Sequence, residues 1–124
     1  MKAFLTLFFT LFIAFSANIA LALEGAELQR VNLLLDLFAT NTDLIMVRNG
    51  AQYPVERAIT HLRNKLSSSP VEINTAEEFI DLLASKSSVT GKPYTIIFPN
   101  GRNIHSSLYF HELLQQVDSE IAQK

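Results

Sequence analysis

Between residues 44 and 50 the chain reads Leu44-Ile45-Met46-Val47-Arg48-Asn49-Gly50. The four apolar residues at its start predict a short buried strand. Asn-Gly directly after a strand is a strong hairpin signal, because a type I′ turn needs a positive φ at both of its central residues. The stretch therefore predicts a hairpin with a short return strand, after which Pro54 is expected to open a helix.

A second stretch of the chain repeats this order. Residues 94–98 predict a strand, Asn100-Gly101 a second two-residue hairpin turn, and Ser106 the cap of a last helix. Sliding the first half by 51 residues places residues 44–47 on residues 95–98. One interpretation is an internal duplication of a helix-hairpin-helix unit. The other is that short hairpins commonly use Asn-Gly, without any duplication.

Helical periodicity surrounds both hairpins. Apolar residues recur at steps of three and four, which predicts helices over residues 24–39, 54–66, 75–86 and 106–121. The third of these begins with Thr75-Ala76-Glu77-Glu78, which has the pattern of a capping box. The expected fold class is α+β, with about four helices packed on a small antiparallel sheet made of the two Asn-Gly hairpins.

The N-terminus has the three parts of an export signal. Lys2 supplies the positive charge, residues 3–15 are almost entirely apolar, and Ala20-Leu21-Ala22 is a cleavage box. We therefore expect residues 1–22 to be a signal peptide and residues 23–124 to be one periplasmic or secreted domain, with no stable membrane span after cleavage. The alternative is an uncleaved anchor, because no charged residue occurs between Lys2 and Glu24.

Composition excludes several classes of function. Lys and Arg number 10 against 12 Asp and Glu. A nucleic-acid-binding domain would show a clustered basic excess, so no nucleic-acid partner is expected. The chain has no cysteine and only three histidines. The lack of cysteine excludes disulfides, thiol catalysis and cysteine-ligated metals, and neither a metal site nor a cofactor is predicted.

One predicted helix carries basic residues at regular spacing. Arg57, His61 and Lys65 follow each other at four-residue steps, which places them on one helix face. This face is a candidate cationic ridge for an anionic partner, and His61 at its ordinary pKa of about 6.5 would add charge on acidification. The alternative is a solvated helix face. Arg48, beside the first turn, is likewise either a recognition residue or a solvated one.

A polar loop is the second candidate site. It reads Ser87-Ser88-Val89-Thr90-Gly91-Lys92, and the candidate binding residues in it are Ser87, Ser88, Thr90 and Lys92. Small hydroxyls, a glycine and a lysine are suited to a backbone nest for an anion. The alternative is a helix end followed by a turn, in which Gly91 and the following Pro93 only shape the backbone.

Four segments of the chain resemble a known protein family. They are Val47-Arg48-Asn49-Gly50, His61-Leu62-Arg63-Asn64-Lys65, residues 75–80 and residues 84–94. In this order they are similar to a family of small exported proteins of Gram-negative bacteria, known as a domain of unknown function. The resemblance implies export and a single α+β domain. It transfers no activity.

Two functions remain compatible with the sequence. The first is a non-catalytic binding or accessory module of the cell envelope, whose partner is an envelope protein or an anionic ligand. The second is a small hydrolase or transferase acting on an envelope component, with residues 85–92 as its reactive segment and His61 as the base. No set of catalytic residues stands out, so the first function is favoured.

Overall fold

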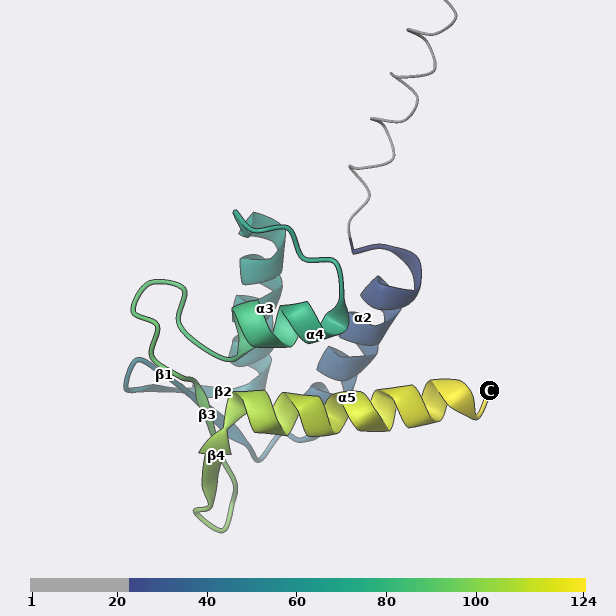
Figure 1. The fold of residues 1–124 in the computed structure, drawn as a ribbon. Coiled ribbons are helices and arrows are strands. Elements are labelled where there is room, and N and C mark those ends of the chain that lie inside the picture. Colours follow the sequence, from purple (N-terminus) through teal and green to yellow (C-terminus); the bar gives the residue numbers. More distant parts are fainter. Residues whose placement is uncertain (1–22) are drawn as a thin grey trace, which may run out of the picture.

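The computed structural model describes residues 23–124. The expected signal peptide, residues 1–22, lies outside the described residues. The elements in chain order are α2 (Gly25–Thr40), β1 (Ile45–Arg48), β2 (Ala51–Pro54), α3 (Val55–Ser68), α4 (Ala76–Phe79), the π-helical turn η2 (Ile80–Ala84), β3 (Thr95–Ile97), β4 (Asn103–His105) and α5 (Ser106–Ala122) (Figure 1). The predicted α+β fold class is confirmed.

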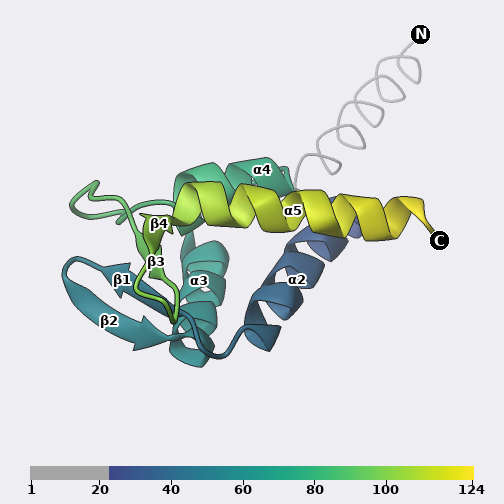
Figure 2. The same ribbon diagram turned by 90° about the horizontal axis from the view of Figure 1, so that it is seen from below.

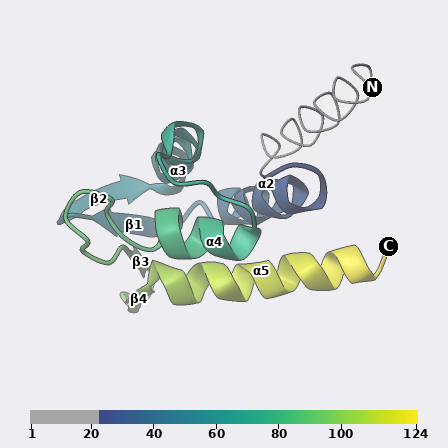
Figure 3. The same cartoon turned by 45° about the horizontal axis from the view of Figure 1, so that its top comes forward.

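The described strands form one antiparallel sheet in the order β2-β1-β3-β4. Helix α3 contacts β1 and β2, while α5 leaves the end of β4 and runs across α2 (Figure 2). Helix α4 and η2 lie between α3 and α5 (Figure 3). The two hairpins thus form the two halves of the sheet, and the helices cover its inner face.

The core lies between the helices and this inner face. Phe38 from α2 meets Phe110 from α5 edge to face, with ring centroids 5.1 Å apart. Met46 on β1 and Ile96 on β3 point into the same core and are fully buried. Edge-to-face aromatic pairs add to the free energy gained from apolar burial. The apolar stripes predicted for the helices therefore form one continuous core.

The first hairpin has the predicted two-residue turn. Arg48 pairs with Ala51, and the turn residues Asn49 and Gly50 have φ values of 49° and 81°. Both φ values are positive, as a type I′ turn requires. An L side chain at the Gly50 position would be strained by this backbone conformation.

The second hairpin differs from the prediction, because its loop has three residues. The Phe98 N–H donates to the Arg102 carbonyl, so Pro99, Asn100 and Gly101 form the loop between them. The Gly101 N–H closes a turn on the Phe98 carbonyl, and Gly101 has a φ of 87°. Pro99 favours the first central position of such a turn and has no N–H for a strand pair. The result is a turn followed by a bulge.

The strand pairing reveals a pseudo-two-fold axis through the middle of the sheet. Met46 pairs with Ile96, and the flanking pairs Ile45–Ile97 and Val47–Thr95 are symmetric about it. Corresponding strand positions are thus 50 residues apart, not 51 as the sequence alignment assumed. A one-residue slip exchanges the two faces of a strand. Corresponding positions in β2 and β4, after the turns, are 51 residues apart, because the second loop contains one more residue, Pro99. The strand register therefore fits the interpretation of two repeated units.

The third predicted helix is shorter than expected and changes character. Helix α4 continues into η2, which ends at Ala84 and not near Lys86. The Ser85 hydroxyl donates to the Ile80 carbonyl over 2.6 Å, a five-residue step that accompanies the wider π-helical turn.

The predicted helix starts need three corrections. Thr75 Oγ1 accepts a hydrogen bond from the Glu78 N–H over 3.0 Å, which is the first half of the capping box. The Glu78 carboxylate lies near the Thr75 hydroxyl and does not accept from the Thr75 backbone N–H, so the second half does not form. Pro54 ends β2 and precedes α3. Ser106 is the first residue of α5, where its buried hydroxyl donates to the Ala84 carbonyl over 2.8 Å instead of capping the helix.

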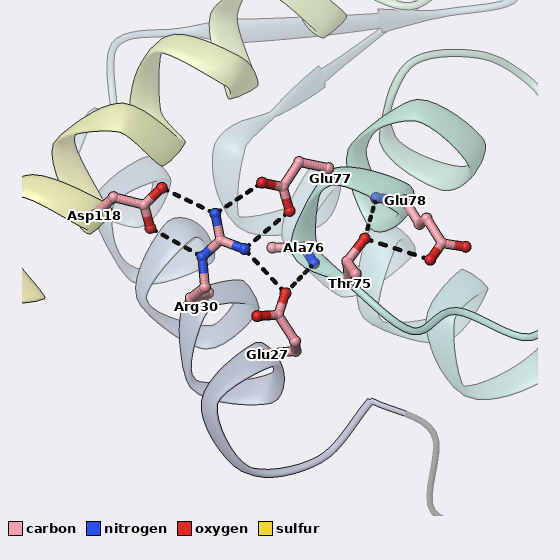
Figure 4. Close-up of polar contacts among 7 residues, drawn as sticks. All are labelled: Glu27, Arg30, Thr75, Ala76, Glu77, Glu78 and Asp118. Atoms are coloured by element: carbon pink, nitrogen blue, oxygen red, sulfur yellow. Dashed lines mark hydrogen bonds and ion pairs between the residues drawn. The ribbon is translucent and has the colours of Figure 1, made fainter. Parts of the chain in front are cut away.

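An arginine network fastens three helices together (Figure 4). Arg30 on α2 donates from Nε and Nη2 to Asp118 on α5, from Nη1 and Nη2 to Glu77 on α4, and from Nη1 to Glu27, at distances of 2.9–3.0 Å. These bonds use all five N–H groups of the guanidinium. They raise the pKa of Arg30 and lower that of Glu77. Glu27 also accepts from the Ala76 N–H at the start of α4.

Candidate anion-binding site

A pocket of about 260 Å³ lies between the first hairpin turn, α3 and the loop that follows η2. Three segments distant in the sequence therefore meet around it. Its lining residues are Arg48, Asn49, His61, Lys65, Ser68, Ser69, Pro70, Leu83, Ser87, Ser88, Val89 and Tyr94. The pocket thus brings together Arg48, two members of the expected ridge and part of the polar loop.

Arg48 is held between two tyrosines. Side chains alternate along β1, so Arg48 shares the inner face with Met46, and Met46 pairs with Tyr53 on β2. The Arg48 Cζ atom lies 4.7 Å from the centroid of the Tyr53 ring and 5.8 Å from that of Tyr94, which precedes β3. Its Nε atom is buried and, within residues 23–124, has no hydrogen-bond partner. The aromatic rings stabilise the charge but leave this donor unsatisfied.

Lys65 has a structural role that the ridge prediction missed. Its Nζ donates to the Leu83 carbonyl over 2.7 Å, to the Lys86 carbonyl over 2.9 Å and to the Tyr94 hydroxyl over 3.1 Å. These bonds use all three ammonium donors and satisfy carbonyls at the end of η2. Lys65 is therefore not a solvated ridge residue, and its charge lies at the pocket with no donor free.

His61 also turns toward Tyr94. Its Nε2 lies 3.4 Å from the Tyr94 hydroxyl. Burial, with smaller contributions from the charges of Arg48 and Lys65, lowers the pKa of His61 to about 4. The imidazole is thus neutral at neutral pH, and the expectation of charging near pH 6.5 is wrong. Since Lys65 already donates to the tyrosine oxygen, the hydroxyl proton is available to the neutral Nε2.

Arg57 and Lys92 do not belong to the pocket. Arg57 is exposed, with its Cζ 5.5 Å from the centroid of the Tyr53 ring. Lys92 is exposed as well, and neither residue lines the cavity. The predicted ridge is therefore divided, because its first member faces solvent while His61 and Lys65 face the pocket.

The polar loop is shaped by its own side chains. Ser87 is buried, and its Oγ accepts from the Val89 and Thr90 N–H groups, each over 3.2 Å. The same oxygen accepts from Asn49 Nδ2 over 3.3 Å, and the Thr90 hydroxyl donates to Asn49 Oδ1 over 2.7 Å. These bonds fasten the loop to the first hairpin turn, a connection that the sequence did not predict. Ser88 lines the pocket beside it.

Tyr53 and Tyr94 are the site residues that sequence reasoning did not single out as binding residues. Tyr94 precedes the buried Ile96 by two positions, and this alternation is the sequence signal that places it on the inner face. Its contact with Arg48 depends on the pairing of β1 with β3, which no local pattern encodes.

Comparison with known proteins agrees with the segments singled out in the sequence. Residues 25–118 match the family of unknown function DUF5329. The chain belongs to this family. It is 50% identical to the uncharacterized protein YfeK of Salmonella typhimurium (strain LT2) over 68 residues, which are 55% of this chain and 57% of that protein. No solved structure matches the chain. The resemblance to a domain of unknown function is therefore confirmed.

Two further findings concern the described part of this DUF5329 chain. Between residues 23 and 124 no helix is long and apolar enough to cross a membrane. The same residues contain no group of three or more histidine, aspartate or glutamate side chains placed to hold a metal ion.

A second pocket occupies the position related to the first by the pseudo-two-fold axis. It has a volume of about 510 Å³ and contains Asp43 and Arg102. The residues at corresponding positions are Leu44 for Tyr94, Phe98 for Arg48, Glu112 for His61 and Gln116 for Lys65. The two halves of the fold therefore carry different chemistry at equivalent places, and only the first pocket has an unpaired cation between aromatic rings.

Proposed function

We propose that the protein is an exported, non-catalytic binding module of the cell envelope, and that the Arg48 pocket holds an anionic group of its ligand. The unpaired Nε of Arg48 carries the proposal. A buried donor without a partner costs free energy, which would be recovered if the Arg48 side chain turned so that this donor met an acceptor on a ligand. The pocket has two cationic side chains and no acidic one in its lining.

The polar contacts of the pocket support binding over the hydrolase or transferase alternative. The ring nitrogen of His61 approaches the Tyr94 hydroxyl, whereas the Ser87 hydroxyl accepts bonds that fix the loop. A serine nucleophile would need its base within hydrogen-bond reach. Export is supported by the tripartite pattern of residues 1–22, and intact mass analysis of the envelope fraction tests it: a chain that begins at Leu23 is expected, and one that retains residues 1–22 would contradict it.

Crosslinking in intact envelopes, followed by mass spectrometry, tests the binding function. We expect the wild-type protein to capture a partner, and capture to weaken with salt because ions screen charge interactions over about 8 Å at physiological ionic strength. Arg48→Gln removes the unpaired cation and should abolish capture.

Arg102→Gln is the matched control. Arg102 also stacks on an aromatic ring, with its Cζ 4.6 Å from the Phe98 centroid, but lies in the second hairpin. It should leave capture unchanged. Equal capture by the Arg48 variant and the wild type would reject the pocket as the binding site.

A further inference from the structure

The charge state of the pocket restricts the kind of anion it can take. Lys65 has bonded all three of its ammonium donors within the protein, and His61 is neutral. Arg48 is thus the one cation in the pocket with an unsatisfied donor. Lys65 adds positive charge but has no free donor, so Arg48 alone among the cations of the pocket can donate to a ligand. One guanidinium can meet both oxygens of a carboxylate, whereas the additional oxygens of a phosphate would find no free cationic donor.

The shape of the available donor suits a carboxylate. A guanidinium presents parallel N–H groups in one plane, and a carboxylate accepts them with two oxygens in that plane. Tyr53 and Tyr94 occupy the flanks of Arg48, one on the strand beside it and the other next to β3. These rings contact the guanidinium without accepting a hydrogen bond from it, which leaves its N–H groups for a ligand.

The size and the apolar part of the pocket limit the ligand further. Its volume of about 260 Å³ is below the roughly 300–1,000 Å³ typical of sites for drug-sized molecules. Leu83, Val89 and Pro70 line it together with the polar groups. A carboxylate attached to an amino-acid-sized group with an aliphatic side chain would fill both parts.

We infer that the Arg48 pocket selects a monocarboxylate of amino-acid size, carried by the C-terminal residue of a peptide or by a small free acid, over a phosphate. This inference rests on the proposed function, because it assumes that the pocket binds an anion.

A titration followed by NMR, with the protein labelled with nitrogen-15, tests the inference. The probes are the tripeptide acetyl-Gly-Ala-Leu with a free C-terminus, the same peptide as its C-terminal amide, sodium acetate and inorganic phosphate. The Arg48 Nε–H signal and the backbone amides of Asn49 and Ser88 report on the pocket. We expect the free peptide to bind about tenfold or more tightly than phosphate and than the amide. Phosphate binding as tightly as the free peptide, or equal binding of peptide and amide, would overturn the inference.

The remaining outcomes distinguish between sources of the ligand, and between failure of the carboxylate inference and failure of the proposed binding function. Acetate binding as tightly as the peptide would overturn the amino-acid size of the inferred ligand and leave a site for any small carboxylate, whereas tighter peptide binding supports a peptide C-terminus. Phosphate binding alone would overturn the inference but leave the proposed anion-binding function in place. Binding of none of the probes would overturn the inference, and the crosslinking experiment would then decide the proposed function independently.

Two conservative variants check that geometry, and not charge alone, is responsible. Arg48→Lys keeps the positive charge but loses the planar pair of donors, so we expect the free peptide to bind about tenfold more weakly. Arg102→Lys makes the same change at the aromatic-stacked arginine of the other hairpin and should leave binding unchanged. Unaltered melting temperatures of both variants would show that the fold is intact, and full binding by Arg48→Lys would overturn the inference.

Discussion

Replacing Arg30 by methionine should weaken the packing of the three helices that it joins. The side chain of Arg30 is 16% exposed, while those of Glu27, Glu77 and Asp118 are 30%, 50% and 49% exposed. Ion pairs of this partly exposed kind contribute about 0.5–1 kcal/mol each. Three pairs therefore give about 1.5–3 kcal/mol, and for a domain of this size the melting temperature should fall by about 7–14 °C.

The loss should depend on pH, because the carboxylates must be ionised to accept the bonds. The hydrogen bond from Arg30 lowers the pKa of Glu77 below its ordinary value of 4.5. A carboxyl group with a lowered pKa stabilises the folded state above its unfolded pKa, and this contribution disappears as the pH falls through the folded pKa. The difference in stability between wild type and Arg30→Met should therefore be complete at pH 7 and shrink below about pH 4.5.

Thermal unfolding monitored by circular dichroism between pH 7 and pH 3 measures both effects. Arg63→Met is the matched control, because exposed Arg63 donates to the neutral Asn32 side chain over 3.0 Å and should change stability by less than about 0.5 kcal/mol. Acid effects from other groups, such as His61, act on wild type and variant alike and cancel in the difference. Equal shifts for the two variants, or a difference that stays constant down to pH 3, would refute the reasoning.

Three other predictions concern single residues. The His61 ring signals should titrate with a midpoint near pH 4 in NMR spectra, and the midpoint should rise in Arg48→Gln because a neighbouring positive charge is removed; a midpoint near 6.5 in the wild type would contradict the burial of the ring. Gly50→Ala should cost about 1–2 kcal/mol in chemical denaturation, because its φ of 81° is unfavourable for an L side chain, and an unchanged midpoint would argue against the type I′ turn. Ser106→Ala should cost about 1–2 kcal/mol in the same assay by leaving the buried Ala84 carbonyl without its partner, and a neutral result would contradict that bond.

The sequence was sufficient for features that depend on local backbone preferences. Asn49-Gly50 predicted the first turn correctly, because its two positive φ values are a property of those residues alone. Asn100-Gly101 was misleading, since Pro99 before it moved the turn by one residue and lengthened the loop. The helix stripes were also predictable, as their periodicity is visible in any one segment.

The candidate site was only partly predictable, because it depends on contacts between segments that are distant in the sequence. The spacing of His61 and Lys65 correctly put them on one helix face, but the direction of that face depends on Tyr94, which lies 29 residues after Lys65. Lys65 was interpreted either as a ligand-binding ridge residue or as a solvated one. Its structural role was missed because the carbonyls that it binds belong to an element whose π-helical end no pattern indicated. The partnership of Arg48 with its two tyrosines needs the pairing of three strands.

The two pockets related by the pseudo-two-fold axis differ in net charge. On one side of the axis the pocket carries Arg48 and Lys65, and on the other the corresponding pocket carries Asp43 and Glu112 with a single arginine. Two related pockets of different net charge create an electric field between them that a symmetric pair of pockets would lack. In an electric field, such as that near a charged surface, the protein experiences a torque before any contact forms. A negatively charged partner would therefore be drawn to the Arg48 pocket and not to the pocket at the related position.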